Sequence, residues 1–222
     1  TNASYCIIYL RGEYLYLAKK IQQVIDTFRA EGILGQSIAG IKGFDFDIRI
    51  EIGAGAYVCG EETALLESME GFRGAPRTKW FYPVEKGYLQ LPTVVNNVET
   101  FAAASRILSI GLSTYLDHGM ENNYGTKLIS VSGDCKLPGI YALDYGTTVD
   151  QLLKQCEADK PWFIQVSGPS GESIPVSEKN RRFSREILKS DHEIRCGGSF
   201  MIFNEERDLL RILLNFNAFF KK

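Results

Sequence analysis

The sequence predicts a mixed α/β protein made of two units with different architecture. The first third alternates strand, helix, strand, loop and helix, which is the order of an α/β layer. The second half places two short strands, a helix and further strands in succession, which is the order of a compact α+β unit. With 222 residues, 45% hydrophobic and 23% charged, the chain has a globular composition and the length of one or two domains.

The first unit is predicted from patterns of hydrophobic residues. The apolar run at residues 6–11 indicates a buried strand. Apolar side chains recur at helical spacing over residues 14–28, which predicts a helix. Residues 45–52 alternate between apolar and charged side chains, as in a strand with one buried face. A glycine-rich loop at residues 53–60 then leads into a helix predicted at 61–70.

A long loop, a capped helix and a polar segment follow. Residues 72–92 are rich in proline, glycine, basic and aromatic residues without periodicity, and long loops inside domains are usually functional. Either Asn96 or Asn97 can cap the next helix, with Glu99 in a capping-box position. The polar segment at residues 116–125 is expected to bury little, so the boundary between the units is predicted there.

The second unit is predicted as strands with one central helix. The strands are expected at residues 127–132, 139–143, 162–167 and 199–203, with the helix at 149–155. A final helix is predicted from Glu205 onward. It runs to the last residue without a capping signal, which indicates that the chain is part of a longer one.

Composition and charge exclude several classes of protein. The 25 Lys and Arg against 27 Asp and Glu give a net charge of −2, which excludes the basic footprint of a nucleic-acid-binding protein. No stretch approaches the ~18 consecutive apolar residues of a membrane-spanning helix. The five cysteines have no Cys-x-x-Cys spacing and only two histidines accompany them, so no metal site is expected. The odd cysteine count favours a reducing compartment.

The glycine-rich loop leads into two adjacent carboxylates at a helix start, Glu61 and Glu62. Gly53, Gly55 and Val58 do not complete the Gly-x-Gly-x-x-Gly dinucleotide fingerprint, and a P-loop lysine is absent from the helix start. Two carboxylates repel phosphate, but they can accept hydrogen bonds from ribose hydroxyls, amides or ring N–H groups. The alternative is that both only complement the helix dipole, an effect of ~0.3–1 kcal/mol each.

Two further groups of residues suggest ligand binding. Arg73, Arg77 and Lys79 share a loop with the aromatic residues 80–82. The cations can neutralise a pyrophosphate and an aromatic ring can stack on a base, whereas the alternative is a hydrophobic anchor with a solvated basic rim. The adjacent amides at residues 96–97 suit a flavin ring edge or a phosphate, and helix capping explains only one of them.

These groups occur in an order that resembles a known family. The segment at residues 53–100, with GEET at 60–63 and VNNVET at 95–100, strongly resembles the flavin-bearing, NADH-oxidising subunit of NADH-quinone oxidoreductase, respiratory complex I. It resembles equally the diaphorase subunits of NAD-linked hydrogenases and formate dehydrogenases. The resemblance implies a partial Rossmann-like FMN-binding α/β domain at 1–120, a β-grasp domain of the soluble-ligand-binding type (SLBB) at 121–203, and the start of a C-terminal helical iron–sulfur domain at 204–222.

The resemblance also implies roles for individual residues. The residues implied to contact FMN are Gly60, Glu61, Asn96, Asn97 and Thr100. Those implied to contact NADH are Glu62, Lys79 and Tyr82. Tyr82 stands where the family usually has a phenylalanine that stacks on the nucleotide, and Glu62 is also the implied catalytic residue.

The implied activity is that of an NADH dehydrogenase or diaphorase subunit, which passes a hydride from NADH to FMN and then single electrons to an iron–sulfur cluster. The implied partners are a thioredoxin-like 2Fe-2S subunit and a larger electron-transfer complex, and the expected location is cytoplasmic, on the cytoplasmic face of a membrane through partner subunits. The family's upstream glycine-rich flavin loop and downstream 4Fe-4S cysteine motif are absent from this sequence, so we expect a fragment that is inactive alone.

Several alternatives stay open at this point. The chain can instead be a non-enzymatic β-grasp ligand- or partner-binding module with a degenerate flavin domain. The terminal electron acceptor can be a quinone, a hydrogenase or a formate dehydrogenase. The nucleotide can be NADH or NADPH, since Arg73 and Arg77 can face either a 2′-phosphate or a pyrophosphate.

Overall fold

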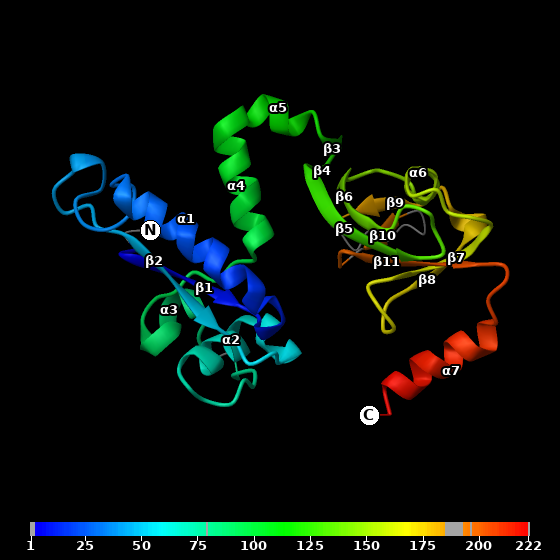
Figure 1. Cartoon of the computed structure of the whole chain (residues 1–222), viewed down its shortest axis with the longest axis horizontal. Helices are drawn as coiled ribbons and strands as arrows, with labels where there is room; N and C mark the ends of the chain where they lie inside the picture. Colours follow the sequence, from blue (N-terminus) through cyan, green and yellow to red (C-terminus); the bar gives the residue numbers. More distant parts are fainter. Residues whose placement is uncertain (1–2, 79, 185–192, 196, 222) are drawn as a thin grey trace. The chain divides into compact units, whose positions relative to one another are not determined.

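The computed structural model describes residues 3–78, 80–184, 193–195 and 197–221. The chain forms two compact units, Thr1–Asn97 and Val98–Lys222 (Figure 1). Each unit combines strands and helices, which confirms the predicted mixed α/β fold. Within the described residues, no helix is long and apolar enough to cross a bilayer.

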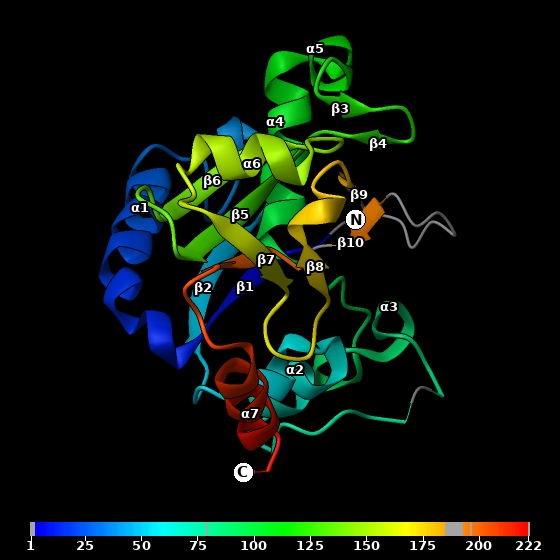
Figure 2. The same ribbon diagram turned by 90° about the vertical axis from the view of Figure 1, so that its right-hand side faces the viewer.

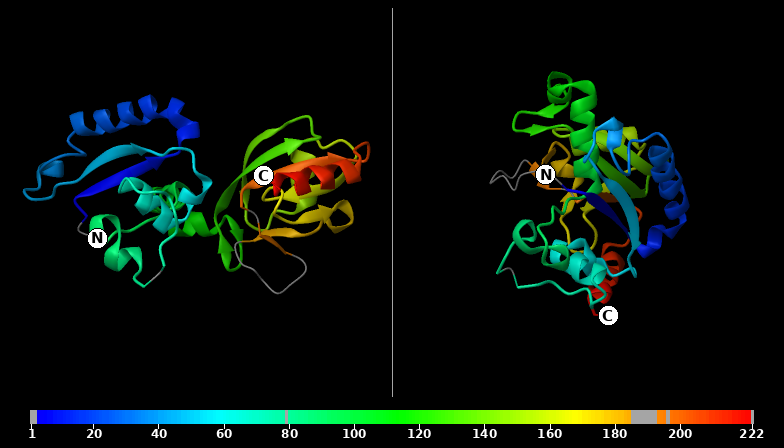
Figure 3. Two further views of the ribbon diagram at one scale, coloured as in Figure 1. Left: turned by 90° about the horizontal axis from the view of Figure 1, so that it is seen from below. Right: turned by 90° about the vertical axis from the view of Figure 1, so that its left-hand side faces the viewer.

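The first unit is built on two parallel strands joined by a helix. β1 (Tyr5–Leu10) pairs with β2 (Asp47–Ile52) along its whole length. α1 (Ala18–Ala30) connects the two strands and lies along the pair (Figure 3). Both strands were predicted, β2 from its alternation. β1 was expected to be a buried strand, but only its last residue, Leu10, is buried.

The helix predicted over residues 14–28 is α-helical only from Ala18. Before it, Gly12–Leu17 forms a 3₁₀ helix that is interrupted at Tyr14, where φ is −107° and ψ is 19°. Of the described side chains of α1, only Ile25 is buried. The apolar face that predicted the helix is therefore covered only in part.

The remainder of the first unit follows β2. The glycine-rich loop leads into α2 (Glu62–Met69), close to the predicted limits, and Leu66 of α2 is 1% exposed. The long loop at residues 72–92 contains α3 (Pro83–Lys86) and a 3₁₀ turn at Tyr88–Gln90. This loop is thus partly structured.

The second unit begins with two helices and a hairpin. α4 (Val98–Ile110) is followed directly by α5 (Leu112–Leu116). The short strands β3 (Gly119–Met120) and β4 (Asn123–Tyr124) then pair antiparallel.

The hairpin occupies the segment at residues 116–125 that was predicted to bury little, and five of these ten residues are exposed, whereas Asn123 and Gly125 are buried. Asn123 is 1% exposed, and its Oδ1 accepts a hydrogen bond from Oγ of Ser184 at 3.2 Å. The chain divides into its two compact units before α4, whereas the predicted domains group α4 with the first unit. The domain limits near residues 120 and 203 stay a prediction.

A five-stranded sheet forms the body of the second unit (Figure 2). In spatial order its strands are β6 (Gly139–Asp144), β5 (Thr126–Gly133), β11 (Ser199–Asn204), β7 (Pro161–Val166) and β8 (Ser173–Pro175). β11 runs parallel to β5 and antiparallel to β7. β9 (Arg182–Ser184) and β10 (Glu193–Arg195) form a separate parallel pair.

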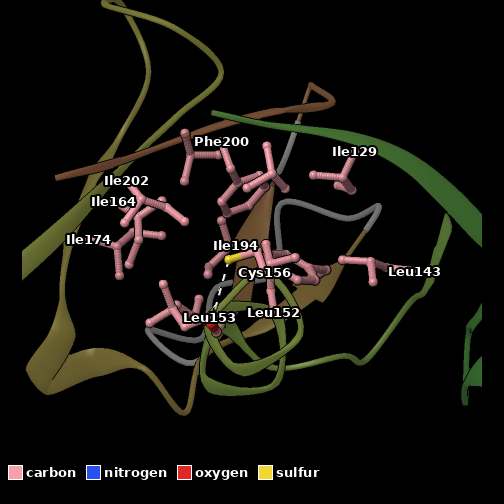
Figure 4. Close-up of a cluster of buried hydrophobic side chains, with 14 residues drawn as sticks. Ile129, Leu143, Leu152, Leu153, Cys156, Ile164, Ile174, Ile194, Phe200 and Ile202 are labelled. Atoms are coloured by element: carbon pink, nitrogen blue, oxygen red, sulfur yellow. Dashed lines mark hydrogen bonds between the residues drawn. The ribbon is translucent and has the colours of Figure 1, made fainter. Parts of the chain in front are cut away.

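One hydrophobic core holds this unit together (Figure 4). Ile129 of β5 and Phe200 of β11 meet Leu152 of α6 (Val149–Gln155) and Ile194 of β10, and each of these side chains is at most 1% exposed. Burying a side chain of this size contributes ~1.5–3 kcal/mol, so the core fixes α6 and the β9–β10 pair on one face of the sheet.

Side-chain caps fix the starts of two helices in the second unit. α6 has the predicted limits, because Thr148 Oγ1 accepts from the amide of Gln151 at 3.2 Å and the Gln151 side chain accepts from the amide of Thr148 at 2.8 Å. α7 (Leu209–Phe219) begins later than predicted, because Asp208 accepts from the amide of Leu210 at 3.0 Å and so caps the helix there.

Candidate functional site

The glycine-rich loop leaves the end of β2 and packs against the residues that follow β1. A Cβ atom on Gly12 would lie 2.8 Å from the carbonyl oxygen of Gly53, and a Cβ atom on Gly53 would lie 2.4 Å from the hydroxyl of Tyr9. Gly55 has a φ of +83°, which L side chains rarely adopt. Packing and backbone conformation therefore explain the glycines at these three positions.

Gly60 differs from the other glycines of this loop. Among the described residues, no atom beyond its chain neighbours and its own short helix lies within 4 Å of a Cβ atom built there; its φ is outside the left-handed region, and the residue is exposed. The fold therefore does not require glycine at position 60. A missing side chain at an exposed loop end lets a ligand approach the backbone closely.

Glu61 is the N-cap of α2. Its Oε2 accepts hydrogen bonds from the amides of Thr63 and Ala64, both at 2.9 Å, and from the Thr63 hydroxyl at 2.5 Å. A side-chain cap of this kind stabilises a helix by ~1 kcal/mol. The alternative in which Glu61 serves the helix start therefore has direct support, while its contact with FMN stays a prediction.

Glu62 occupies the first position of α2 and is half-buried. A carboxylate in the first turn of a helix is stabilised by the helix dipole. The position of Glu62 therefore agrees with the alternative in which it only complements this dipole. Tyr57, in the same glycine-rich loop, is 89% exposed. The nucleotide contact and the catalytic role of Glu62 stay predictions.

Arg77 holds the long loop against α2. Its guanidinium forms ion pairs with Glu67 and, at 2.7 Å, with Glu70. Its amide donates to the Thr63 hydroxyl at 2.9 Å, and Glu70 also accepts from the amide of Leu89 at 2.8 Å. These ion pairs support the alternative in which Arg77 anchors the loop, while a phosphate contact of Arg77 stays a prediction.

A cavity of about 190 Å³ lies between α2, the long loop and α3. It is lined by Thr63, Leu66, Arg77, Thr78, Trp80, Phe81, Pro83, Lys86 and Gln90. The ammonium of Lys86 stands 4.0 Å from the centroid of the Phe81 ring, a cation–π distance. Lys86 was not among the site residues predicted from the sequence, although it lines this cavity. Its position shortly after the aromatic run was the available signal.

The aromatic run itself is largely exposed. Trp80 is 83% exposed and Tyr82 is 63% exposed, so both rings are available to a ligand. The backbone amide of Tyr82 donates to Glu85 at 3.1 Å, which fixes the start of α3. Lys79, a predicted NADH ligand, lies outside the described residues.

Three predicted FMN ligands lie further along the chain. Asn96 and Asn97 are exposed at the end of the first unit, and Thr100 is exposed in the first turn of α4 in the second unit. The first unit thus brings together Gly60, Glu61 and Glu62 with the loop that carries Tyr82, through the bond from the Arg77 amide to Thr63. Across the described residues, no three His, Cys, Asp or Glu side chains are grouped to hold a metal ion.

Residues 1–106 match the family model described as the Nuo51 FMN-binding domain. The chain is 48% identical over 214 residues to the alpha subunit of the NAD-reducing hydrogenase HoxS of Cupriavidus necator, covering 96% of this chain and 35% of the relative. It is 47% identical over 152 residues to an NADH-quinone oxidoreductase subunit of Aquifex aeolicus, covering 68% of this chain and 35% of the relative. An NADH-quinone oxidoreductase subunit of Rickettsia rickettsii is 34% identical over 228 residues, with 99% of this chain and 53% of the relative covered.

A crystal structure of an NAD⁺-reducing [NiFe]-hydrogenase in the air-oxidised state superposes with a TM-score of 0.82 at 36% identity. It covers 98% of this chain and 36% of the hydrogenase chain. The chain therefore spans about a third to a half of the length of the relatives it matches. These matches confirm the resemblance inferred from the sequence.

Proposed function

We propose that this chain, which belongs through residues 1–106 to the family of the Nuo51 FMN-binding domain, supplies part of the flavin and nucleotide site of an NADH-oxidising subunit. The observation that carries the proposal is the bond from the Arg77 amide to the Thr63 hydroxyl at 2.9 Å. It holds the aromatic, basic loop beside the start of α2. The start of α2, with Gly60, Glu61 and Glu62, and the loop that carries Tyr82 thereby share one region of the first unit.

The flavin side is assigned to Gly60, Glu61, Asn96, Asn97 and Thr100. The open space around Gly60 fits a planar ring that approaches the backbone, since no non-neighbouring atom of the part of the chain that the structure describes lies within 4 Å of a Cβ atom built there. Glu61 contributes by fixing the helix start through its bonds to the amides of Thr63 and Ala64. The exposed amide side chains can donate to and accept from the flavin edge or its phosphate.

The nucleotide side is assigned to Glu62, Lys79 and Tyr82. Tyr82 offers an exposed ring for stacking, and a tyrosine retains the aromatic face of the phenylalanine that is usual in the family. Glu62 can accept hydrogen bonds from the ribose or the amide of NADH. FMN, when bound, supplies the ring that accepts the hydride, and these residues orient the nucleotide toward it.

The finer fold description belongs to the same proposal. We assign residues 1–120 to a partial Rossmann-like domain, supported by the parallel β1–α1–β2 arrangement. We assign residues 121–203 to a β-grasp domain of the soluble-ligand-binding type, supported by the five-stranded sheet packed on α6. Residues 204–222 are assigned to the start of a helical iron–sulfur domain, whose 4Fe-4S cluster would be held by cysteines of the complete subunit.

The relatives are subunits of multi-subunit enzymes, among them an NAD-reducing hydrogenase and an NADH-quinone oxidoreductase. By analogy, the complete polypeptide that contains these residues passes electrons to a thioredoxin-like 2Fe-2S subunit and a larger complex in the cytoplasm.

The proposal is tested by the flavin content of the complete polypeptide after purification. Acid-released cofactor is identified and counted by chromatography, and the expected result is close to one FMN per chain. A folded protein that neither retains FMN nor takes it up when supplied would refute the flavin assignment. That result would favour the non-enzymatic β-grasp module instead.

A further inference from the structure

Glu99 connects the first turn of α4 to the beginning of β5, in addition to lying beside the predicted FMN ligands. Its Oε1 accepts a hydrogen bond from the amide of Leu128 at 3.0 Å, and its Oε2 accepts from the ammonium of Lys127 at 2.5 Å. In the sequence, Glu99 lies 28 residues before Lys127 and 29 residues before Leu128. All three residues belong to the second unit.

The bond from Leu128 to Glu99 gives a hydrogen-bond acceptor to a backbone amide of β5 that lies outside the β5–β11 pairing. β5 pairs with β11 only from Ser130 onward, and the amide of Ser130 donates to the carbonyl of Gly198 at 2.8 Å. Amides two residues apart point to the same side of a strand, so the Leu128 amide faces the β11 side before β11 begins. At Leu128 the Glu99 carboxylate accepts the hydrogen bond that a strand carbonyl would otherwise accept. Hydrogen bonds to a charged group are stronger than neutral ones.

Glu99 is surrounded in sequence by residues assigned to the flavin. Asn97 is bonded directly to the first residue of α4, and Thr100 follows Glu99 in its first turn. Consecutive helical residues point about 100° apart, so Glu99 can be held on β5 while Thr100 presents a different face. Asn97 and Thr100 are exposed, whereas the Glu99 side chain is 36% and the Lys127 side chain 22% exposed.

We propose that Glu99 is a positioning residue for flavin binding, which holds the first turn of α4, with Thr100, in place by anchoring α4 to β5. The inference rests on the proposed function, since it assigns a role relative to FMN. Glu99 does not touch the ligand in this proposal. Its effect on FMN affinity comes from restricting the motion of Thr100, which does.

Linkage makes the proposal quantitative. If anchoring by Glu99 raises the affinity for FMN by some factor, bound FMN must strengthen the contact between Glu99 and Leu128 by the same factor. Hydrogen exchange at the Leu128 amide reports on that contact, because exchange requires the hydrogen bond to open. Bound FMN also slows exchange through global unfolding at every amide, so the contact is tested by slowing at Leu128 beyond that at Ser130, whose amide donates to Gly198 from the same strand.

The experiment compares Glu99→Ala and Glu99→Gln with the parent in the complete polypeptide. Glu121→Gln, an exposed change in the turn of the β3–β4 hairpin, is the matched control. We expect Glu99→Ala to weaken FMN binding about fivefold or more. Glu99→Gln retains an oxygen for the Leu128 amide and is expected to recover most of the affinity. In the parent and the control, saturating FMN should slow exchange at Leu128 beyond that at Ser130 by the factor that Glu99→Ala loses in affinity.

Three results would contradict the inference. If Glu99→Ala binds FMN with the affinity of the parent, Glu99 does not position Thr100 for FMN binding. If Glu99→Ala does not fold, Glu99→Gln and the exchange measurement on the parent decide, and slowing by FMN at Leu128 no greater than that at Ser130 overturns the proposal. A parent that binds no FMN at all overturns the proposed function as well, which distinguishes that failure from the other two.

Discussion

Replacing Gly60 with alanine separates the effect of a ligand from the effect of the fold. A Cβ atom at this position meets no non-neighbouring atom of residues 3–78, 80–184, 193–195 and 197–221 within 4 Å, and the backbone is outside the left-handed region. Alanine should therefore be tolerated, and it removes conformational freedom from the unfolded chain. We expect the ligand-free protein to be as stable as the parent, or more stable by ~0.4–1 kcal/mol.

The same methyl group should weaken FMN binding if the flavin approaches the backbone at Gly60. Forcing an extra methyl into a packed contact costs about 1–3 kcal/mol, which corresponds to a loss of affinity of roughly 5- to 150-fold. FMN fluorescence titration gives the dissociation constant, and thermal unfolding without FMN gives the stability. The expected combination is unchanged or higher stability with weaker binding.

Gly139 provides the matched control, because a Cβ atom there also meets nothing within 4 Å and its φ is outside the left-handed region. It begins β6, a strand to which no flavin contact is assigned. Gly139→Ala should leave FMN affinity unchanged. If Gly60→Ala binds FMN as tightly as Gly139→Ala does, the flavin does not approach position 60 and that assignment is wrong.

Three further outcomes are expected. Arg77→Met should lower the free energy of unfolding by ~2 kcal/mol, because Glu67 and Glu70 lose their shared cation. Arg73→Met, at an exposed site, should change thermal unfolding little. Equal unfolding of the two variants would refute the structural role of Arg77. Glu62→Gln in the complete polypeptide should change NADH affinity without changing flavin content, and unchanged nucleotide binding would leave only its helix-dipole role. Burial raises the pKa of the Cys156 thiol to about 11, so its thiolate is roughly 100-fold scarcer at pH 8 than for an ordinary thiol. Peptide mapping after iodoacetamide treatment should show correspondingly slow alkylation, and rapid labelling of the folded protein would contradict the burial.

Sequence reasoning succeeded where local interactions decide the structure. The limits of α6 follow from Thr148 and Gln151, which cap each other three residues apart and are visible in sequence. The strand β2 follows from its alternating isoleucines and charges. The start of α2 after the glycine-rich loop was also predicted, and Glu61 caps it through bonds that span two and three residues.

Sequence reasoning failed where a residue distant in the sequence determines the local structure. The hairpin at residues 116–125 looked like an exposed linker because it is polar, but Asn123 is buried against a serine 61 residues away. Arg77 looked like a free cation, yet its ion pair with Glu67 spans ten residues. The helical pattern over residues 14–28 gave no sign that Gly12 packs against the carbonyl of Gly53, where the chain begins a 3₁₀ helix instead.

The central claim is that these residues form part of a site where NADH reduces bound FMN. The most direct measurement is an anaerobic titration of the complete, FMN-loaded polypeptide with NADH, followed by the visible absorbance of the oxidised flavin. The account predicts that the absorbance falls in proportion to added NADH until one equivalent per flavin has been supplied. An FMN-loaded, folded protein whose flavin absorbance does not respond to NADH would contradict it.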